Sequence, residues 1–175
     1  MDLIIRNAKL RNAQALCDIG LADGLIKHIA PKIDAQAKQE INAAGNLVCP
    51  PFCDPHMHLD AALSGGSPRY NDKSTLLEGI AIWGERKTKL TRQELVNNAK
   101  EAVLWEFANG VQFIRTHADT TAPGLITLEA LLEVKDAMRE LVDIQVVAFP
   151  QDGIFSSPGD AAQKLMVRAM DMGAD

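Results

Sequence analysis

Residues 45–60 read GNLVCPPFCDPHMHLD, and the character of the sequence changes across this stretch. Before it, short extended runs are broken by turn residues, and Asp23-Gly24 between two such runs is typical of a β-hairpin. After it, apolar segments alternate with helical stretches, which is the pattern of βα units with a parallel sheet. We therefore expect a small β domain over residues 1–46 and a separate α/β domain over residues 47–175.

Three βα units are expected in the second domain. Thr91 is suited to cap a helix, with Glu94 reaching back to it, and Gly110 is suited to end that helix. The expected strands cover residues 47–53, 111–119 and 142–151, and the expected helices cover residues 74–90, 91–110, 127–140 and 159–172.

Three strands are too few for a closed barrel. A parallel barrel with a filled interior needs about eight strands, and the sequence ends at residues 173–175, just where a fourth strand would be due. We therefore expect the first three βα units of a (β/α)8 barrel of the TIM type, truncated and not stable on its own. The alternative is a complete small three-layer domain whose last helix is C-terminal.

Composition and charge exclude some classes of partner. The net charge is −5, the pI is near 5.4, and Lys and Arg do not cluster, which argues against a nucleic-acid surface. No apolar run is long enough for a signal peptide or a membrane span. We expect a cytoplasmic protein that binds a small molecule and neither nucleic acid nor a membrane, and a homo-oligomer stays open.

The cysteines do not predict a disulfide framework. Cys17, Cys49 and Cys53 are an odd number in a chain without an export signal. Cys49 and Cys53 could form a thiolate metal pair, although a single CxxxC spacing is a weak zinc signal. We expect reduced, buried, structural thiols.

The first strand of the α/β domain leads into two histidines. His56 and His58 alternate along an extended chain, so their side chains project to the same side and can share one metal ion. Neutral imidazole suits zinc, iron and similar divalent ions. Ligands and catalytic groups gather at the carboxyl ends of parallel strands, and this position favours a metal site over an incidental pair.

Other polar residues near these histidines are weaker candidates. Asp54 and Asp60 share the parity of the histidines, and Cys53 has the opposite parity. Asp54 could accept a hydrogen bond from an imidazole, with the capping of a turn before Pro55 as the plainer alternative. Asp60 lies past the strand, which weakens any such role.

The second and third strands also end in polar side chains. Arg115, His117 and Asp119 alternate to one face, where an active-site role competes with a buried histidine bonded to an acid. Gln151 follows the third strand. Its amide can both donate to and accept from the edge of an amide-containing heterocycle, and a simple turn residue is the alternative.

The combined segments resemble bacterial cytosine deaminases of the amidohydrolase superfamily over nearly the whole chain. They are residues 45–60, 75–87 (TLLEGIAIWGERK), 109–119 (NGVQFIRTHAD) and 142–153 (VDIQVVAFPQDG). The resemblance implies a metal-dependent barrel preceded by part of a small β-sandwich. It also implies hydrolytic deamination of cytosine, or of a closely related pyrimidine, with uracil and ammonia as the products from cytosine.

The resemblance implies roles for single residues as well. His56 and His58 would ligate one catalytic divalent ion, iron or zinc, and Gln151 and the backbone around Leu76 would contact the pyrimidine. His117 and Asp119 would lie in or near the site, in roles that the resemblance does not fix. The family's remaining metal ligands and its acid/base glutamate have no counterpart and would lie beyond residue 175, so the chain by itself is expected to be inactive.

Two other functions stay open. An amidohydrolase acting on an N-alkyl aminotriazine would share several of these segments, although residues 50–52 (PPF) and 149–151 (FPQ) favour cytosine deaminase. Isocytosine or a 5-substituted cytosine as the substrate also stays open. A non-catalytic, amidohydrolase-like scaffold would account for the missing ligands. The retained His56 and His58 argue against it.

Overall fold

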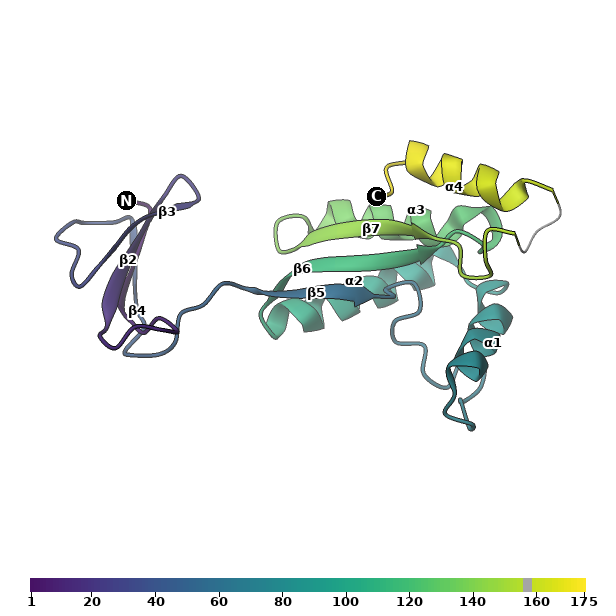
Figure 1. Ribbon diagram of the computed structural model, residues 1–175, viewed down its shortest axis with the longest axis horizontal. Coiled ribbons are helices and arrows are strands. Elements are labelled where there is room, and N and C mark those ends of the chain that lie inside the picture. The colour runs from purple at the N-terminus through teal and green to yellow at the C-terminus, as the bar shows by residue number, and fades with distance from the viewer. Residues whose placement is uncertain (156–158) are drawn as a thin grey trace. The chain divides into compact units, whose positions relative to one another are not determined.

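A computed structural model describes residues 1–155 and 159–175. The chain separates into two compact units, Met1–Pro50 and Pro51–Asp175 (Figure 1). The expected division of domains between residues 46 and 47 stays a prediction.

The first unit is a four-stranded sheet in the order β3-β2-β1-β4. Its strands are β1 Leu3–Ala8, β2 Cys17–Ala22, β3 Leu25–Ala30 and β4 Gln39–Asn42. Strand β1 pairs antiparallel with β2 and parallel with β4. The β2-β3 turn has φ values of 54° at Asp23 and 70° at Gly24, and a two-residue hairpin with positive φ at both positions is the one that the sequence predicts.

A buried carboxylate ties the first unit together. Asp18 is 5% exposed, and its oxygens accept hydrogen bonds from the Arg6 guanidinium at 2.8 Å and from the backbone N–H groups of Asn7 and Ile33, both at 3.1 Å. The Arg6 hydrogen bond is the main reason why the pKa of Asp18 lies below its ordinary value. Asp18 thereby joins β1 and β2 to the segment that follows β3.

The second unit is built on a parallel sheet of three strands in the order β5-β6-β7. The strands are β5 Phe52–Met57, β6 Val111–Asp119 and β7 Asp143–Phe149, and the helices are α1 Leu76–Lys87, α2 Arg92–Ala108, α3 Ile126–Met138 and α4 Ala161–Asp171, with a short 3₁₀ turn, η1, at Pro123–Leu125. Strand β6 has the predicted bounds, and each of the other predicted strands and helices is found with shifted ends. None of the described helices combines the length and apolarity that spanning a membrane requires.

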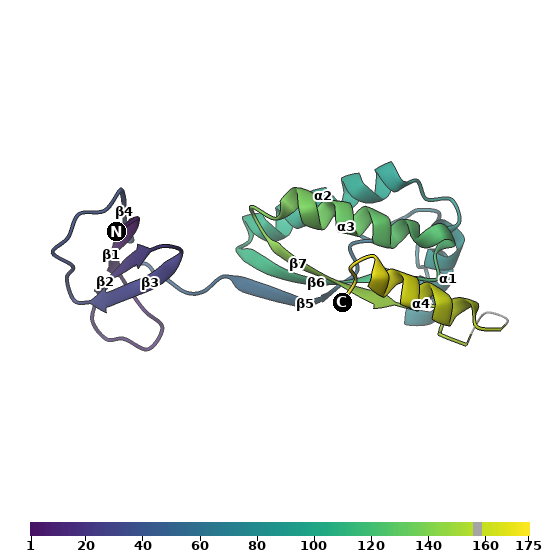
Figure 2. The same cartoon turned by 90° about the horizontal axis from the view of Figure 1, so that it is seen from above.

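Helices α2 and α3 cover the same side of this sheet, as Figure 2 shows. Alternate strand residues point toward these helices, because successive side chains of a strand face opposite sides. The core contains Ile114, Ala118, Ile144 and Val146 from the sheet and Leu95, Val103, Leu128, Leu131 and Val134 from the helices. The other face of the sheet carries polar residues of the candidate site.

Two local details differ from expectation. Strand β5 begins at Phe52 rather than at residue 47, because residues 46–48 pair with Lys9 of the first unit and because Pro50 and Pro51 have no N–H to donate to a neighbouring strand. The Thr91 hydroxyl accepts from the Glu94 backbone N–H at 3.2 Å, as predicted, but the Glu94 carboxylate binds Arg86 at 2.6 Å instead of reaching back. Only half of the expected capping box forms.

The cysteines are unpaired, in agreement with expectation. The expectation that they are buried was wrong for two of them, since Cys49 and Cys53 are exposed and Cys17 is partly buried. Cys49 lies in the irregular segment before Pro50-Pro51, and Cys53 lies on the sheet face away from α2 and α3, where those helices do not cover it.

Candidate metal centre

Three histidines meet at the carboxyl ends of β5 and β6. His56 lies in β5, His58 directly after it, and His117 in β6, and one ring nitrogen of each lies within 4.8 Å of the others. The rings of His56 and His117 stack with centroids 4.0 Å apart, and His58 stands at 5.4 Å from His56 and 5.5 Å from His117. The structure therefore brings the predicted His56 and His58 pair together with His117.

His58 is held through two neighbouring contacts. The next residue, Leu59, is 1% exposed and donates its backbone N–H to the Thr116 hydroxyl in β6 at 3.0 Å. The His58 ring meets the edge of Phe149, at the end of β7, with centroids 5.4 Å apart. These contacts fix the chain where it leaves β5, so that His58 stays over the strand ends.

The environments of His58 and His117 differ. Burial lowers the pKa of His117, whose Nδ1 lies 3.4 Å from the Met57 carbonyl oxygen. The pKa of His58 is raised, first of all by the carboxylate of Asp60, whose Oδ1 lies 3.7 Å from His58 Nδ1. A metal-ligating histidine usually binds the ion through one ring nitrogen and donates the N–H of the other to a carboxylate. His58 and Asp60 are placed for this arrangement.

Asp60 belongs to the site, although its position past the strand predicted only a weak role. It is 4% exposed, and its Oδ2 accepts from the backbone N–H of Asp119 at 2.9 Å. Its Oδ1 faces His58 and is buried without a hydrogen-bond partner among the described residues. A buried carboxylate oxygen costs free energy unless it is paired, so Asp60 is placed to bond a protonated His58 Nδ1.

Asp54 has a different place from the one that its parity suggested. The pairing of β5 with β6 shifts register between Asp54 and Met57, so Asp54 aligns with the buried Ile114 rather than following the histidines. Its Oδ1 accepts from the backbone N–H of His56 at 3.0 Å. Asp54 thus caps the backbone, which is the plainer of its two predicted roles.

The predicted substrate residues line one cavity beside the histidines. The cavity has a volume of about 470 Å³. It is lined by Leu76, the first residue of α1, and by Gln151, two residues after β7. His58 and Asp119 reach it from the strand ends. Its remaining lining is mostly apolar and is formed by Ala61, Gly79, Ile80, Trp83 and Phe149, together with Asp60.

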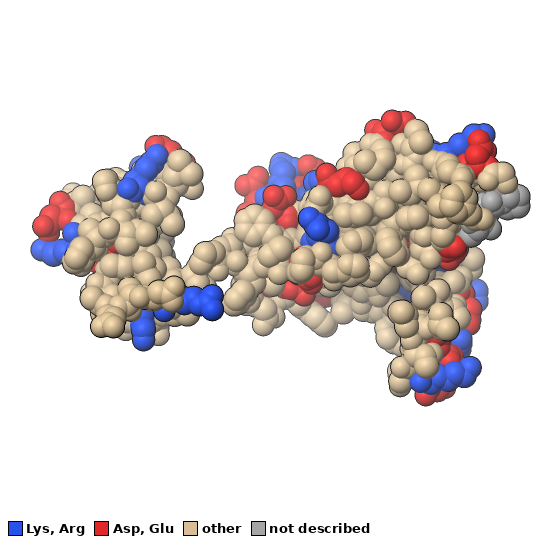
Figure 3. Space-filling view, viewed as in Figure 1, with Lys and Arg blue, Asp and Glu red and all other residues tan. Residues whose placement is uncertain are grey.

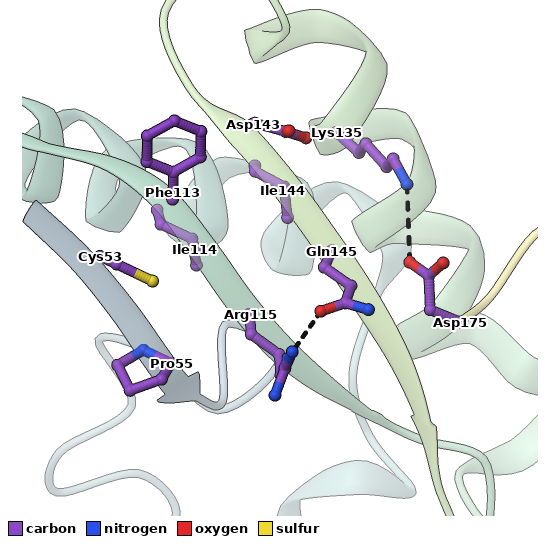
Figure 4. A pocket seen from close by; sticks show the side chains of 10 residues that line it. All are labelled: Cys53, Pro55, Phe113, Ile114, Arg115, Lys135, Asp143, Ile144, Gln145 and Asp175. Carbon is purple, nitrogen blue, oxygen red and sulfur yellow. Dashed lines mark hydrogen bonds and ion pairs between the residues drawn. The ribbon is translucent and has the colours of Figure 1, made fainter. Parts of the chain in front are cut away.

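Arg115 lies apart from this cavity, although it alternates with His117 along β6. Its Nε donates to Gln145 Oε1 in β7 at 2.6 Å. Both side chains line a second cavity of about 440 Å³ farther down the sheet, together with Cys53 and Pro55 of β5 (Figure 4). The three polar residues that alternate along β6 therefore lie in two places: His117 and Asp119 lie at the strand ends, and Arg115 lies at the middle of the sheet.

The residues at the strand ends fit a divalent ion. The imidazoles of His56, His58 and His117 lie close enough together to supply nitrogen ligands to one ion. The unpaired Oδ1 of Asp60 is placed to accept a hydrogen bond from the His58 ring. Imidazole nitrogen suits zinc and iron alike, so the donor set fits either metal without choosing between them.

Charged side chains of both signs are interspersed over the face of the molecule shown in Figure 3. Several form ion pairs within a unit, such as Arg92 with Glu133 at 2.7 Å. The acidic groups at the candidate site, Asp60 and Asp119, are buried rather than displayed.

Comparison with known proteins agrees with this geometry. The sequence model of a family described as the amidohydrolase family matches residues 39–173. N-isopropylammelide isopropyl amidohydrolase of Pseudomonas sp. (strain ADP) is 33% identical over 183 aligned residues, which cover 99% of this chain and 44% of that protein.

Two solved structures extend the likeness to three dimensions. A 5-methylcytosine deaminase from Klebsiella pneumoniae, liganded with 5-fluorocytosine, superposes with a TM-score of 0.90 at 43% identity, covering 98% of this chain and 42% of the other. An N-isopropylammelide isopropylaminohydrolase from Burkholderia multivorans gives a TM-score of 0.80 at 29% identity, with coverages of 100% and 44%. The chain thus spans less than half the length of these relatives, and the likeness confirms the predicted fold class, in which βα units of a barrel follow part of a β-sandwich.

Proposed function

This chain belongs to the amidohydrolase family, and from that premise we propose that it carries the first part of a metal-dependent site for the hydrolytic deamination of cytosine or a closely related pyrimidine. With cytosine, the overall reaction consumes one water molecule and yields uracil and ammonia.

One observation carries the proposal: a candidate metal ligand and the candidate ring contacts border a single cavity. His58, Leu76 and Gln151 all line it. These three residues are well separated in the sequence, yet the fold brings them together at the strand ends. Concave sites at this end of a parallel sheet are where small-molecule chemistry takes place.

His56 and His58 would hold the ion, and His117 stands beside them. A divalent ion in such a site lowers the pKa of water, so that a nucleophile is available near neutral pH. Asp60 would keep His58 in the tautomer that turns Nε2 toward the ion, because its Oδ1 faces Nδ1.

Gln151 and the apolar wall would recognise the ring. The amide of Gln151 offers both a donor and an acceptor, which matches the alternating edge of a cytosine ring. Ile80, Trp83 and Phe149 present apolar surface to the same cavity and would keep water away from the faces of a flat heterocycle.

Deamination also requires a proton carrier, and Asp119 is poorly suited to that task. Both of its carboxylate oxygens already accept hydrogen bonds, from Trp83, Lys87 and Thr121. A carboxylate that is saturated in this way acts as a fixed structural charge, while a proton carrier needs a free oxygen facing the substrate. We therefore assign Asp119 no acid/base role.

A second candidate function is hydrolysis of an N-alkyl aminotriazine with release of the alkylamine. The likeness to N-isopropylammelide hydrolases over essentially the whole chain favours it. We rank the pyrimidine first because the identity to the 5-methylcytosine deaminase is higher, at 43% against 29% in the two structural comparisons. Isocytosine and 5-substituted cytosines remain alternatives within the pyrimidine proposal.

The test uses the protein that contains this chain, loaded separately with zinc and with iron. Cytosine, 5-methylcytosine, isocytosine and N-isopropylammelide are supplied in turn, and both ammonia and isopropylamine are measured. We expect more ammonia to be released from a pyrimidine than isopropylamine from the triazine. Isopropylamine as the dominant product would establish the second candidate, and no product together with no tightly bound ion would indicate a non-catalytic scaffold.

A further inference from the structure

We propose that Lys87 and Asp119 form a buried clamp that holds helix α1 over the strand ends and orients Trp83 as one wall of the ring-binding cavity. Both would be positioning residues, since they act on the substrate through Trp83. The inference rests on the proposed function as far as the identity of the substrate is concerned. The clamp itself is a matter of contacts within this chain.

Asp119 is the fixed point of the clamp. It ends β6, is 1% exposed, and accepts four hydrogen bonds with its two carboxylate oxygens. Oδ1 accepts from the backbone N–H and the hydroxyl of Thr121, and Oδ2 accepts from Trp83 Nε1 at 2.7 Å and Lys87 Nζ at 3.1 Å. The Asp119 backbone is held as well, because its N–H donates to Asp60 at 2.9 Å and its carbonyl accepts from Thr127 at 2.7 Å.

Lys87 comes from the last turn of α1 and is 7% exposed. Its ammonium group binds Asp119 Oδ2, the Thr121 hydroxyl at 2.9 Å and Asp152 Oδ2 at 2.6 Å. An ammonium group has three N–H donors, so all of them have a partner. Lys87 thereby connects α1 to the segments that follow both β6 and β7.

Trp83 lies four residues before Lys87, which places both side chains on the same face of α1. Its indole N–H and the Lys87 ammonium converge on the same oxygen of Asp119. The hydrogen bond fixes the rotation of the indole ring, and the ring lines the same cavity as His58 and Gln151. Asp119 therefore couples the position of Trp83 to the strand that carries His117.

The position of α1 determines the shape of the cavity, because the helix supplies Leu76, Gly79, Ile80 and Trp83 to its lining. Figure 1 shows α1 beyond the strand ends, away from the layer that α2 and α3 form. Two exposed leucines, Leu76 and Leu77, begin the helix and are 80% and 78% exposed. The buried polar contacts at the other end of α1, rather than apolar packing at its start, therefore hold this helix against the strand ends.

The experiment uses the protein that contains this chain and compares Lys87→Met with Lys89→Met. Lys89 is an exposed lysine just past the end of α1, so its replacement controls for loss of a charge. Backbone hydrogen exchange is measured without substrate, and KM and kcat are measured with whichever ring compound the product test selects. The clamp predicts faster exchange of residues 76–87 in Lys87→Met, unchanged exchange of β6 and β7, and no effect of Lys89→Met.

The kinetic prediction separates positioning from general destabilisation. Lys87→Met should raise KM on the order of 10- to 100-fold, while kcat changes less, since the variant disturbs a wall that binds ground state and transition state alike. Trp83→Phe keeps an aromatic ring but loses the N–H, and should raise KM in the same direction. Because both variants act through Asp119 Oδ2, the double variant should raise KM by less than the product of the single effects.

A milder variant covers the case in which Lys87→Met does not fold. Asp152→Asn removes only the partly exposed partner of Lys87 and leaves the buried pair with Asp119 in place, so it should speed exchange of residues 76–87 and raise KM by a smaller factor. Unchanged exchange of α1 in these variants would overturn the clamp, even if the substrate has been misidentified. Independent, multiplicative effects of Lys87→Met and Trp83→Phe on KM would overturn the coupling through Asp119.

Discussion

Asp60 Oδ1 lies 3.7 Å from His58 Nδ1, and within the described part of the chain this buried carboxylate oxygen has no hydrogen-bond partner. The other oxygen of Asp60 is anchored by the Asp119 backbone N–H. His58 and Asp60 are only two positions apart in the sequence, but the Asp60 carboxylate is held in place by Asp119 of the neighbouring strand β6. His58 is therefore backed by a fixed acceptor that leaves its Nε2 free to face an ion.

Replacing this acceptor should weaken metal binding. In Asp60→Asn the charge behind His58 is lost, and we expect metal affinity to fall about 10- to 100-fold, as is usual for partners of ligating histidines. Asp54→Asn is the matched control, because the Asp54 carboxylate bonds the His56 backbone rather than an imidazole ring. Metal dissociation constants from chelator competition measure the difference. Equal affinities of Asp60→Asn and the unaltered protein would show that Asp60 has no influence on the ligand.

Thr116 should be important for placing His58. In Thr116→Val the Leu59 backbone N–H loses its acceptor inside the core, which we expect to destabilise the fold by about 1–3 kcal/mol. Thr120→Val is the control, because the Thr120 hydroxyl contacts the weaker sulfur acceptor of Met166 at 3.4 Å. Denaturant unfolding of both variants provides the measurement. A Thr120→Val effect as large as that of Thr116→Val would argue against a special role for the Leu59 bond.

Gln151→Ala should damage substrate recognition and spare metal binding. The lost amide contact should reduce substrate binding by about 1–3 kcal/mol, which appears as a raised KM. Gln145→Ala is the control, since Gln145 lies in the second cavity and bonds Arg115. Steady-state kinetics and metal analysis check both parts. Loss of metal with unchanged KM would mean that Gln151 is a ligand or a structural residue.

Alternation of side chains was enough to predict the strands and their chemistry where the backbone is regular. Strand β6 was predicted with its observed bounds, and His117 and Asp119 do end it on the same side. The same reasoning misplaced Asp54, because the register shift in β5 breaks the two-residue period that it relies on. A bulge of this kind depends on how β5 meets β6, which no pattern within residues 52–58 records.

The residues that sequence reasoning missed act through partners distant in the chain. Lys87 stands in the charged run Glu85-Arg86-Lys87 and reads as part of a solvated helix end, yet it is buried against Asp119 and Asp152. Trp83 reads as an apolar residue of an amphipathic helix, and only the fold shows its indole N–H bonded to Asp119. One signal in the sequence could have suggested the contact. Trp83 and Lys87 are spaced four apart on a predicted helix, and the strand that follows later ends in the carboxylate of Asp119.

The first unit should be sensitive to acid through Asp18. Its pKa is lowered in the folded state, chiefly by Arg6, so its contribution to stability is complete above the unfolded value of about 3.9 and is lost as the pH falls through the lower folded value. Asp18→Asn should remove that contribution and destabilise this unit by about 1–3 kcal/mol at neutral pH. Hydrogen exchange of β1 and β2 against pH follows the effect. The same acid dependence in Asp18→Asn as in the unaltered protein would contradict this account.

The most direct test of the central claim joins metal content to ammonia release in the His58→Ala variant of the protein that contains this chain. His28→Ala is the matched control, because His28 lies exposed on β3 in the first unit. Metal per protein is determined by elemental analysis, and ammonia is measured with cytosine as the substrate. We predict that His58→Ala loses both the tightly bound ion and the release of ammonia, because the remaining nitrogen ligands are too few to hold the ion, while His28→Ala retains both. Full metal content and full ammonia release in His58→Ala would contradict the claim that the metal site begins at His56 and His58.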